Sequence, residues 1–393
     1  MLLRATNIVK AKLINLWVVF EAIRIEGPIS RSAIAELTGL SKQAISDLVD
    51  ELLAKHYVRE EKSIGRGVGK PPTPISVDPS GAYTLGFHVD FGRLKTVVMN
   101  LAGEILLGND FVMEELEPRR AAATLGQIAK NLLSQTGIGR DRVLGIGLAT
   151  PGPFAVAGLS PPRLPGWDGL SLRHMLGEAT GFRVSLANDG QCAATAEWRF
   201  GSIARRLTNF VYVYLGMGVG SGVMIHSAAF GGAAGNAGEF GHITVVPGGH
   251  PCACGKSGCL ETYVSIDSAI RFVAARGEAV SSMGMFEQAF TADDPSVKAW
   301  LNEATEPLRI GLNTIENLFD PETIMVGGNG PTWVHDALLE RVEPLYPSVG
   351  GIERNIPRLM KAELGPDAVA RGAAVLPVLS KLDPQYHRLN RFG

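Results

Sequence analysis

Residues 238 to 261 read GEFGHITVVPGGHPCACGKSGCLE, and this segment holds three of the four cysteines of the chain. Cys252, Cys254 and Cys259 lie in a glycine-rich knuckle, and His242 stands ten residues before the first of them. One histidine and three cysteines can complete a tetrahedral site, and zinc is the metal that such ligands prefer. The segment therefore predicts a structural zinc ion bound by His242, Cys252, Cys254 and Cys259.

The prediction of a zinc site has two alternatives. The three thiols could lie together by chance, although cysteine is otherwise nearly absent from the chain. His250 could compete as a ligand, but it stands only two residues before Cys252, which favours an exposed loop position. The isolated Cys192 is expected to be a small buried hydrophobic residue. Cysteines this few and this clustered exclude a secreted disulfide scaffold and indicate a reducing compartment.

The composition of the chain is that of a globular protein. Its 393 residues include 37 Lys and Arg, 39 Asp and Glu, and 46% hydrophobic residues, so we expect two or three domains. The apolar stretch from Leu13 to Phe20 is interrupted by Asn15 and is far too short to cross a membrane. No signal peptide is recognisable, so we expect a cytoplasmic protein without a membrane partner.

The first eighty residues differ in charge from the chain as a whole. They carry eleven Lys and Arg against nine Asp and Glu, a net charge of +2, whereas the whole chain has −2. They are therefore the only segment expected to bind a polyanion. A helix is predicted from about Ile8 to Ile25. Its apolar stripe consists of Leu13, Trp17, Phe20 and Ile23.

Two further helices are predicted from their caps. Ser30 is suited to cap a second helix whose inner face is Ile34 and Leu37. Gly39 supplies a tight turn, and Ser41 caps a third helix. The core face of that third helix consists of Ile45, Leu48, Val49 and Leu52. Two short helices joined by a glycine turn predict a helix-turn-helix.

Four side chains at the start of the third helix point outward and can reach base edges or phosphates in a major groove. They are Ser41, Lys42, Gln43 and Ser46. Two strands, at residues 57–61 and 74–77, flank a basic glycine-rich tip that carries Arg66 and Lys70. This pattern predicts a winged helix-turn-helix whose wing contacts the DNA backbone or minor groove.

A helical module for protein contacts or dimerisation is the alternative to a DNA-binding domain. Asp47, Asp50 and Glu51 count mildly against DNA binding, because carboxylates that face phosphates weaken it. The capped helices and the basic wing together favour DNA binding.

After Pro79, Ser80 and Gly81, the chain alternates predicted strands with predicted helices. Strands are expected at residues 83–89, 94–100, 143–148, 184–187, 211–215, 223–225 and 323–326, and helices include residues 121–134 and 299–318. This alternation predicts an α/β body of two lobes with a cleft. We expect the winged helix-turn-helix in residues 1–80 and the body in residues 81–393. Its lobes would be residues 81–190 with the C-terminal helix and residues 191–375.

Four glycine-rich turns follow predicted strands, at residues 90–92, 151–153, 216–222 and 327–330. Each could bring backbone N–H groups close to a ligand, so together they favour a ligand cleft. Their spacing matches neither a P-loop nor a dinucleotide-binding fingerprint, which excludes those two classes.

With these features the chain resembles the ROK family of repressors and sugar kinases over nearly its whole length. Gly241 and His242 followed by CACGKSGCLE match the zinc signature of that family. The wing that ends in Gly69-Lys70-Pro71-Pro72 is similar to that of members with an N-terminal DNA-binding domain. The resemblance implies two actin-like, ribonuclease-H-like lobes and a sugar-responsive repressor. Operator DNA and a sugar or sugar derivative are the implied partners, and a homodimer or higher oligomer is expected because such proteins read two half-sites.

The resemblance also implies a sugar site. In kinases of the family an Asn-Asp pair after a strand holds the sugar, and the Asp is the general base. That pair corresponds to Asn188 and Asp189 here, and Glu239, His242 and Glu261 complete the implied site. A bound zinc ion would fix the orientation of the His242 ring, and His242 would then have no catalytic role. The alternative role of Asp189 is to cap the helical run at residues 191–199.

Two loops depart from the kinase pattern. The first should read Asp-x-Gly-x-Thr, but here Leu94 follows Asp90-Phe91-Gly92-Arg93, and in the second Met217 replaces the Thr of Gly-Thr-Gly. Without those hydroxyl donors phosphoryl transfer should be lost, so we expect no enzyme. An ATP-dependent sugar kinase remains the alternative, and a zinc-stabilised scaffold that binds no sugar is a weaker one. Arg163, where kinases tend to have Asn, points to an anionic or phosphorylated sugar.

Overall fold

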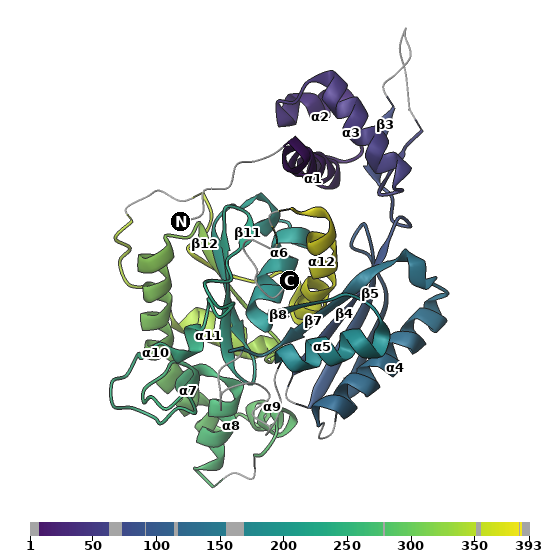
Figure 1. Cartoon of the computed structure of the whole chain (residues 1–393). Helices are drawn as coiled ribbons and strands as arrows, with labels where there is room; N and C mark the ends of the chain where they lie inside the picture. Colours follow the sequence, from purple (N-terminus) through teal and green to yellow (C-terminus); the bar gives the residue numbers. More distant parts are fainter. Residues whose placement is uncertain are drawn as a thin grey trace.

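The computed structural model of the chain describes residues 8–62, 73–90, 92–113, 117–154, 169–277, 280–350, 355–384 and 386. A small N-terminal domain stands above a larger body, in which two sheets flank a central pair of helices (Figure 1). Among the described residues, no helix combines the length and the apolar character needed to cross a bilayer.

The N-terminal domain is a winged helix fold, as predicted. Its elements are α1 (Ile8–Glu26), β1 (Ile29–Ser30), α2 (Arg31–Thr38), α3 (Lys42–Ala54), β2 (Val58–Glu60) and β3 (Pro74–Val77). The predicted caps are confirmed, since the Ser30 and Ser41 hydroxyls accept from the backbone N–H of Ala33 and Ala44. Gly39 has a φ of 70°, the left-handed conformation that glycine adopts at low cost. The strands pair in the order β1-β3-β2.

Two of the predicted core residues face solvent instead. Leu13 is 44% exposed and Leu37 is 60% exposed, whereas Ile34 is fully buried. The buried residues of α1 begin at Leu16, and Leu37 lies in the last turn of α2, so both residues stand at the edge of the buried core. The buried face of α1 consists of Leu16, Val19, Phe20 and Ile23.

The body contains two five-stranded sheets with the same topology. The first runs in the order β6-β5-β4-β7-β8 and the second in the order β11-β10-β9-β12-β13. In each sheet the first three strands are antiparallel and the last two join in parallel. This repetition confirms the expected pair of α/β lobes. The strands are β4 (Tyr83–Asp90), β5 (Arg93–Asn100), β6 (Ile105–Val112), β7 (Val143–Thr150), β8 (Val184–Asn188), β9 (Phe210–Leu215), β10 (Val219–Ile225), β11 (Ala228–Ala229), β12 (Thr323–Gly327) and β13 (Leu359–Lys361).

Only part of the glycine-rich segment at residues 216–222 forms a turn, so the predicted turn is too long. Strand β10 already begins at Val219, so only residues 216–218 connect it to β9. Gly220 and Gly222 therefore belong to a strand. Gly222 lies against the backbone carbonyl of Gly190, where a Cβ atom would come within 2.1 Å. The close approach of the first turn of α6 to β10 explains why glycine stands in that strand.

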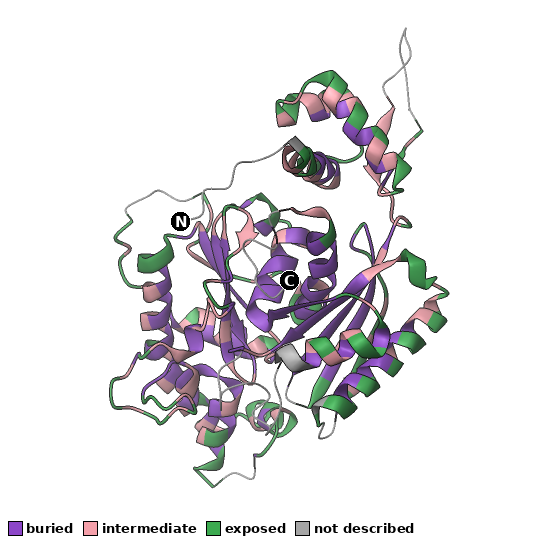
Figure 2. Ribbon diagram, viewed as in Figure 1, coloured by how far each residue is buried: buried purple, intermediate pink, exposed green. Residues whose placement is uncertain are grey.

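Helices α6 (Asp189–Phe200) and α12 (Ala368–Leu382) lie between the two sheets (Figure 1) and are largely buried (Figure 2). Small residues allow this close packing. A Cβ atom on Gly372 would come within 1.8 Å of the Cys192 carbonyl oxygen, and one on Gly147 of β7 within 1.6 Å of that of Ala373. Cys192 itself is fully buried, as predicted.

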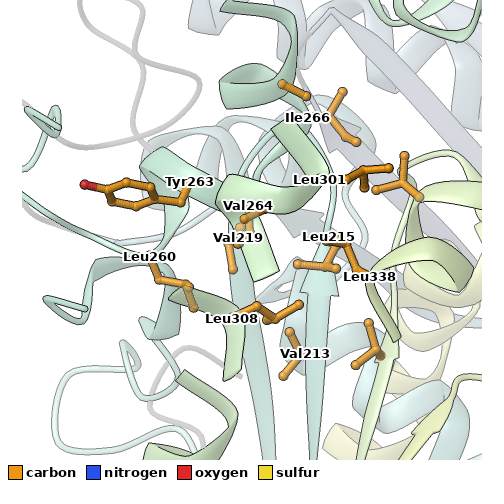
Figure 3. Packing of buried hydrophobic residues seen from close by; sticks show 14 of the residues in the cluster. Val213, Leu215, Val219, Leu260, Tyr263, Val264, Ile266, Leu301, Leu308 and Leu338 are labelled. Carbon is orange, nitrogen blue, oxygen red and sulfur yellow. The ribbon is translucent and has the colours of Figure 1, made fainter. Parts of the chain in front are cut away.

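The remaining helices cover the outer faces. Helices α4 (Pro118–Thr136) and α5 (Gly169–Thr180) pack on the first sheet, and the second lobe carries α7 (Glu261–Val264), α8 (Ile266–Ala274), α9 (Met283–Thr291), α10 (Pro295–Phe319) and α11 (Thr332–Arg341). Short 3-10 turns occur at Arg140–Arg142, Ala204–Arg206, Phe240–His242 and Gly365–Asp367. Figure 3 shows Leu260 and Val264 near Val219 and Leu308, so the segment that follows the cysteine knuckle packs into the hydrophobic core of the second lobe.

A largely buried charge cluster joins the N-terminal domain to the body. Arg24 of α1 donates to the backbone carbonyl of Arg199, the penultimate residue of α6, at 3.0 Å, and Glu21 pairs with both guanidiniums. Burial favours a raised pKa for Glu21, but Arg199 and Arg24 outweigh it and lower that pKa. Burial also lowers the pKa of Arg199 to about 10. The apolar core of the N-terminal domain continues into the body through Leu101 and Val378.

Replacement of Glu21 by Gln should destabilise the protein by about 3 kcal/mol, because it leaves two buried guanidiniums without their counter-charge. Urea denaturation would measure the loss. Glu36→Gln, at an exposed position of α2, is the matched control and should leave the midpoint unchanged. Equal midpoints for the two variants would contradict a stabilising role for the cluster.

Candidate functional site

All five residues of the implied sugar site line one cavity where the two lobes meet. They are Asn188, Asp189, Glu239, His242 and Glu261. The first two stand at the junction of β8 and α6, whereas the other three belong to the second lobe. The cavity has a volume of about 80 Å³ and could hold several water molecules.

Asn188, rather than Asp189, caps α6. The Asn188 side-chain oxygen accepts from the backbone N–H of Gln191 at 2.7 Å, and Asp189 is the first residue of the helix. The predicted alternative role of Asp189 as the helix cap is therefore wrong, because the preceding residue already fills that position. The Asp189 carboxylate instead lies 3.3 Å from the imidazole Nε2 of His88.

His88 of β4 contacts Asp189 from the adjoining cavity, and the sequence analysis did not single it out. Its side chain is 4% exposed, and its ring lies near the carboxylates of Asp189 and Asp90, with one ligand atom from each residue within 4.8 Å of the others. Burial opposes a charge on His88, but Asp189 and Asp90 raise its pKa above the usual value. A lone imidazole within the apolar run from Leu85 to Val89 was the signal that could have revealed it.

Four carboxylates line the cavity, those of Asp90, Asp189, Glu239 and Glu261. Burial raises the pKa of Glu239 to about 7, and the nearby charges of Glu261 and Asp189 add to that effect. Glu261 begins α7, and its carboxylate accepts from the backbone N–H of Val219 at 3.1 Å. A cavity lined by Asp189, Glu239 and Glu261 offers acceptors to hydroxyl donors and repels anions. It therefore suits a neutral polyol, and Arg163, which pointed to an anionic sugar, lies outside the described residues.

The cysteine knuckle brings its four predicted ligands together beside this cavity. The Cys252 sulfur lies 3.5 Å from the His242 Nδ1 atom, and the Cys254 and Cys259 sulfurs lie 3.5 Å apart. All four ligand atoms lie within 4.8 Å of one another. Sulfurs that share one tetrahedral zinc ion lie about 3.8 Å apart, so the donor set fits such an ion. His250 stands outside the group and pairs with Glu303 at 2.8 Å.

A second cavity of about 210 Å³ adjoins Asp90, and residues of the two loops that depart from the kinase pattern line it. Met217 lines it, whereas Leu94 is fully buried in the core of the first lobe. The Asn329 side chain donates to the Asp90 carboxylate across this cavity. Its described lining residues include two carboxylates, Asp90 and Asp110, and none with a hydroxyl side chain. Arg93 and Lys95 also line it, and both pair with Asp110.

The predicted DNA-binding residues of α3 lie on one accessible face. Ser41, Lys42 and Gln43 are exposed and Ser46 is half-buried, whereas Arg66 and Lys70 of the predicted wing lie outside the described residues. The Gln43 amide donates to Asp47 at 2.9 Å, so these two side chains share that face.

The other two acidic residues of α3 are ion-paired. Asp50 pairs with Arg31 at 3.0 Å, and Glu51 pairs with Lys12 at 2.7 Å and with Lys55 at 2.6 Å. Their charges are therefore compensated within the domain, which leaves Asp47 as the acidic group beside the predicted DNA contacts.

Fold and site together define a two-lobed, actin-like protein with a winged helix domain at its N-terminus. The chain belongs to the ROK family, whose model matches residues 87–378. The model of the MarR family matches residues 17–67, which form most of the winged helix domain. Both matches agree with the resemblance inferred from the cysteine knuckle and the wing.

The chain is similar to regulators along nearly its full length. It is 26% identical over 382 residues to the xylose repressor of Bacillus spizizenii, covering 95% of this chain and 97% of that protein. It is also similar to the crystal structure of a ROK family transcriptional regulator, a homologue of the E. coli MLC protein. The TM-score is 0.76 at 25% identity, covering 94% of this chain and 96% of that one.

Kinases match a smaller share of this chain than the regulators do. The ROK hexokinase of Thermus thermophilus has a TM-score of 0.62 at 30% identity, covering 77% of this chain and 99% of that one. The glucokinase of Halalkalibacterium halodurans is 28% identical over 285 residues, covering 67% of this chain and 85% of that protein.

Replacement of Cys254 by Ser should release the metal from the knuckle, because the site loses one of its four ligands. Elemental analysis of the purified protein should show about one metal ion per chain in the parent and almost none in the variant. Cys192→Ala changes a buried cysteine outside the knuckle and should retain the metal. Metal retained by the Cys254 variant would count against the four-ligand assignment.

Proposed function

We propose that this protein is a sugar-responsive transcriptional repressor. The winged helix domain binds operator DNA, and a neutral sugar or sugar derivative binds in the interlobe cavity. One observation carries the proposal: residues from both lobes converge as hydrogen-bond acceptors on one cavity, in a chain that aligns with regulators over nearly its whole length. A repressor acts where the operator DNA is, so the protein works in the cytoplasm.

The cavity residues have distinct roles in sugar binding. Asp189, Glu239 and Glu261 accept hydrogen bonds from sugar hydroxyls, and each carboxylate can serve two neighbouring groups. The side-chain oxygen of Asn188 already accepts a hydrogen bond as the cap of α6, so its NH₂ group is the one available to the ligand. His242 reaches the cavity from the knuckle, where a zinc ion bound by His242, Cys252, Cys254 and Cys259 would supply structural rigidity and fix the imidazole ring.

Helix α6 supports a route from the cavity to the DNA. It begins beside the sugar ligands Asn188 and Asp189 and reaches Arg199, which pairs with Glu21 of α1. A sugar that binds the closed lobes more tightly shifts the population of α6 positions and carries α1 with it. In a homodimer that movement changes the spacing of two DNA-binding domains, and hence the fit to two half-sites.

Sugar phosphorylation is the second candidate function, because Asp189 stands where a general base would act and kinases are among the relatives. The adjoining cavity counts against it, since Met217 lines that cavity and no described lining residue offers a hydroxyl to a phosphate. A coupled assay with ATP and a panel of hexoses and pentoses should show no turnover above that of the Asp189→Asn variant. Turnover that depends on Asp189 would establish the kinase instead.

Replacement of Asp189 by Asn should weaken sugar binding about 10- to 100-fold, because it removes a charged acceptor from the cavity. Thermal shift against a panel of neutral sugars identifies the ligand, and calorimetry then measures the affinity. Operator affinity without sugar should stay unchanged. Glu287→Gln on the exposed face of α9 is the control, and equal sugar affinity in the two variants would exclude this cavity as the sugar site.

Replacement of Lys42 by Ala should weaken DNA binding. It should also reduce the slope of log K against log salt concentration by about one, as expected for one lost phosphate contact. The probe is a duplex selected from a random pool by the parent protein. Lys130→Ala, exposed on α4 in the body, should have no effect. Identical salt slopes for all three proteins would place the DNA elsewhere than on the start of α3.

A further inference from the structure

A cavity of about 280 Å³ lies at the junction between the N-terminal domain and the body. Four arginines line it: Arg24 of α1, Arg199 of α6, Arg205 of the following 3-10 turn, and Arg371 of α12. Glu104 is the only acidic residue among its described lining residues, and it accepts from the Asn100 amide at 2.7 Å. The cavity is therefore strongly basic, in contrast to the carboxylate-lined sugar cavity.

Two of the four arginines share a single counter-charge. Glu21 pairs with Arg24 at 2.8 Å and also with Arg199. One carboxylate between two guanidiniums leaves a net positive charge at this wall of the cavity. Arg24 also donates one N–H group to the backbone carbonyl of Arg199.

The other two arginines have no hydrogen-bond or ion-pair partner among the described residues. No hydrogen bond or ion pair links the guanidinium of Arg205 or Arg371 to any residue in the described part of the chain. The Arg371 Nε atom is buried without a hydrogen-bond partner, and its guanidinium lies 4.5 Å from the centre of the Phe200 ring. Stacking of this kind holds a guanidinium in place while its N–H groups remain available.

The acidic groups nearest to these two arginines are engaged elsewhere. Asp367 pairs with Lys95 at 2.9 Å, and Glu363 accepts from the backbone N–H groups of Ser202 and Ile203. The Glu197 carboxylate accepts two backbone N–H groups, and burial raises its pKa to about 7. The excess positive charge of the cavity is therefore not cancelled by carboxylates in hydrogen-bond contact with it.

We propose that this junction cavity binds a small phosphate monoester, with its phosphate group on Arg205 and Arg371. Guanidiniums bind phosphate oxygens in a bidentate manner, which a point charge cannot do. Met99, Val375 and Val378 line the same cavity and offer an apolar surface to the carbon part of the ligand. The site is separate from the sugar cavity in position and in charge.

The ligand would bridge the two parts of the chain, because Arg24 belongs to α1 and the other three arginines belong to the body. Occupancy would hold the DNA-binding domain against the end of α6. This regulatory consequence rests on the proposed repressor function, whereas phosphate binding itself does not. The protein would then respond both to a neutral sugar and to a phosphorylated metabolite.

Calorimetry of the full-length, metal-loaded protein with glycerol 3-phosphate tests the proposal, with glycerol and inorganic phosphate as further probes at constant ionic strength. We expect saturable binding of glycerol 3-phosphate, one per chain, and none of glycerol. Arg205→Gln/Arg371→Gln should weaken it at least tenfold, while the control Arg119→Gln/Arg120→Gln, exposed on α4, should not. The single variant Arg205→Gln, at an exposed position, should weaken binding without affecting folding.

Equal affinity in the parent and in both Arg205 variants, or heat that only follows ionic strength, would overturn the proposal. Binding of inorganic phosphate alone would assign the site to the free anion rather than to a monoester, and would overturn the ligand class. The Asp189→Asn variant separates this site from the sugar cavity. It should keep phosphate binding in full, and loss of that binding would place the phosphate in the sugar cavity instead.

Discussion

The close contact between α6 and α12 is the constraint on which the rest of the structure depends. Gly372 leaves so little space beside the Cys192 carbonyl that a Cβ atom would come within 1.8 Å, and both helices lie between the two sheets. Interiors packed this tightly change by discrete shifts rather than by gradual deformation. Helix α6 therefore cannot move without the lobes, and Arg199 passes any such movement to α1 through Glu21.

Electrostatics divides the molecule into two kinds of site. The interlobe cavity gathers Asp189, Glu239 and Glu261, which accept from hydroxyl groups and disfavour anions. The junction cavity gathers arginines, of which Arg205 and Arg371 form no ion pair in the described part of the chain. Because α6 runs from one site to the other, a neutral sugar and a phosphate monoester would both act on the position of this helix.

Local features were predictable from the sequence, whereas tertiary contacts were not. The caps by Ser30 and Ser41 follow from bonds within three residues, and the knuckle ligands follow from their spacing and residue types. The residues of the sugar cavity were assembled through the family resemblance, because nothing in the spacing of Asn188 and Glu261 indicates that they meet. His88, the exposure of Leu37 and the Glu21 cluster depend on which elements pack together. Strand β6 was missed because Gly108-Asn109-Asp110 has low strand propensity, and pairing with β5 overrides it.

The central claim is that sugar binding reaches the DNA-binding domain through α6 and α1. Hydrogen–deuterium exchange of the full-length protein, with and without the sugar, tests it most directly. The account predicts altered protection in two places besides the cavity: the last turn of α6 around Arg199, and residues 21–26 of α1. Altered protection confined to the cavity, in a protein whose operator affinity still responds to the sugar, would contradict it.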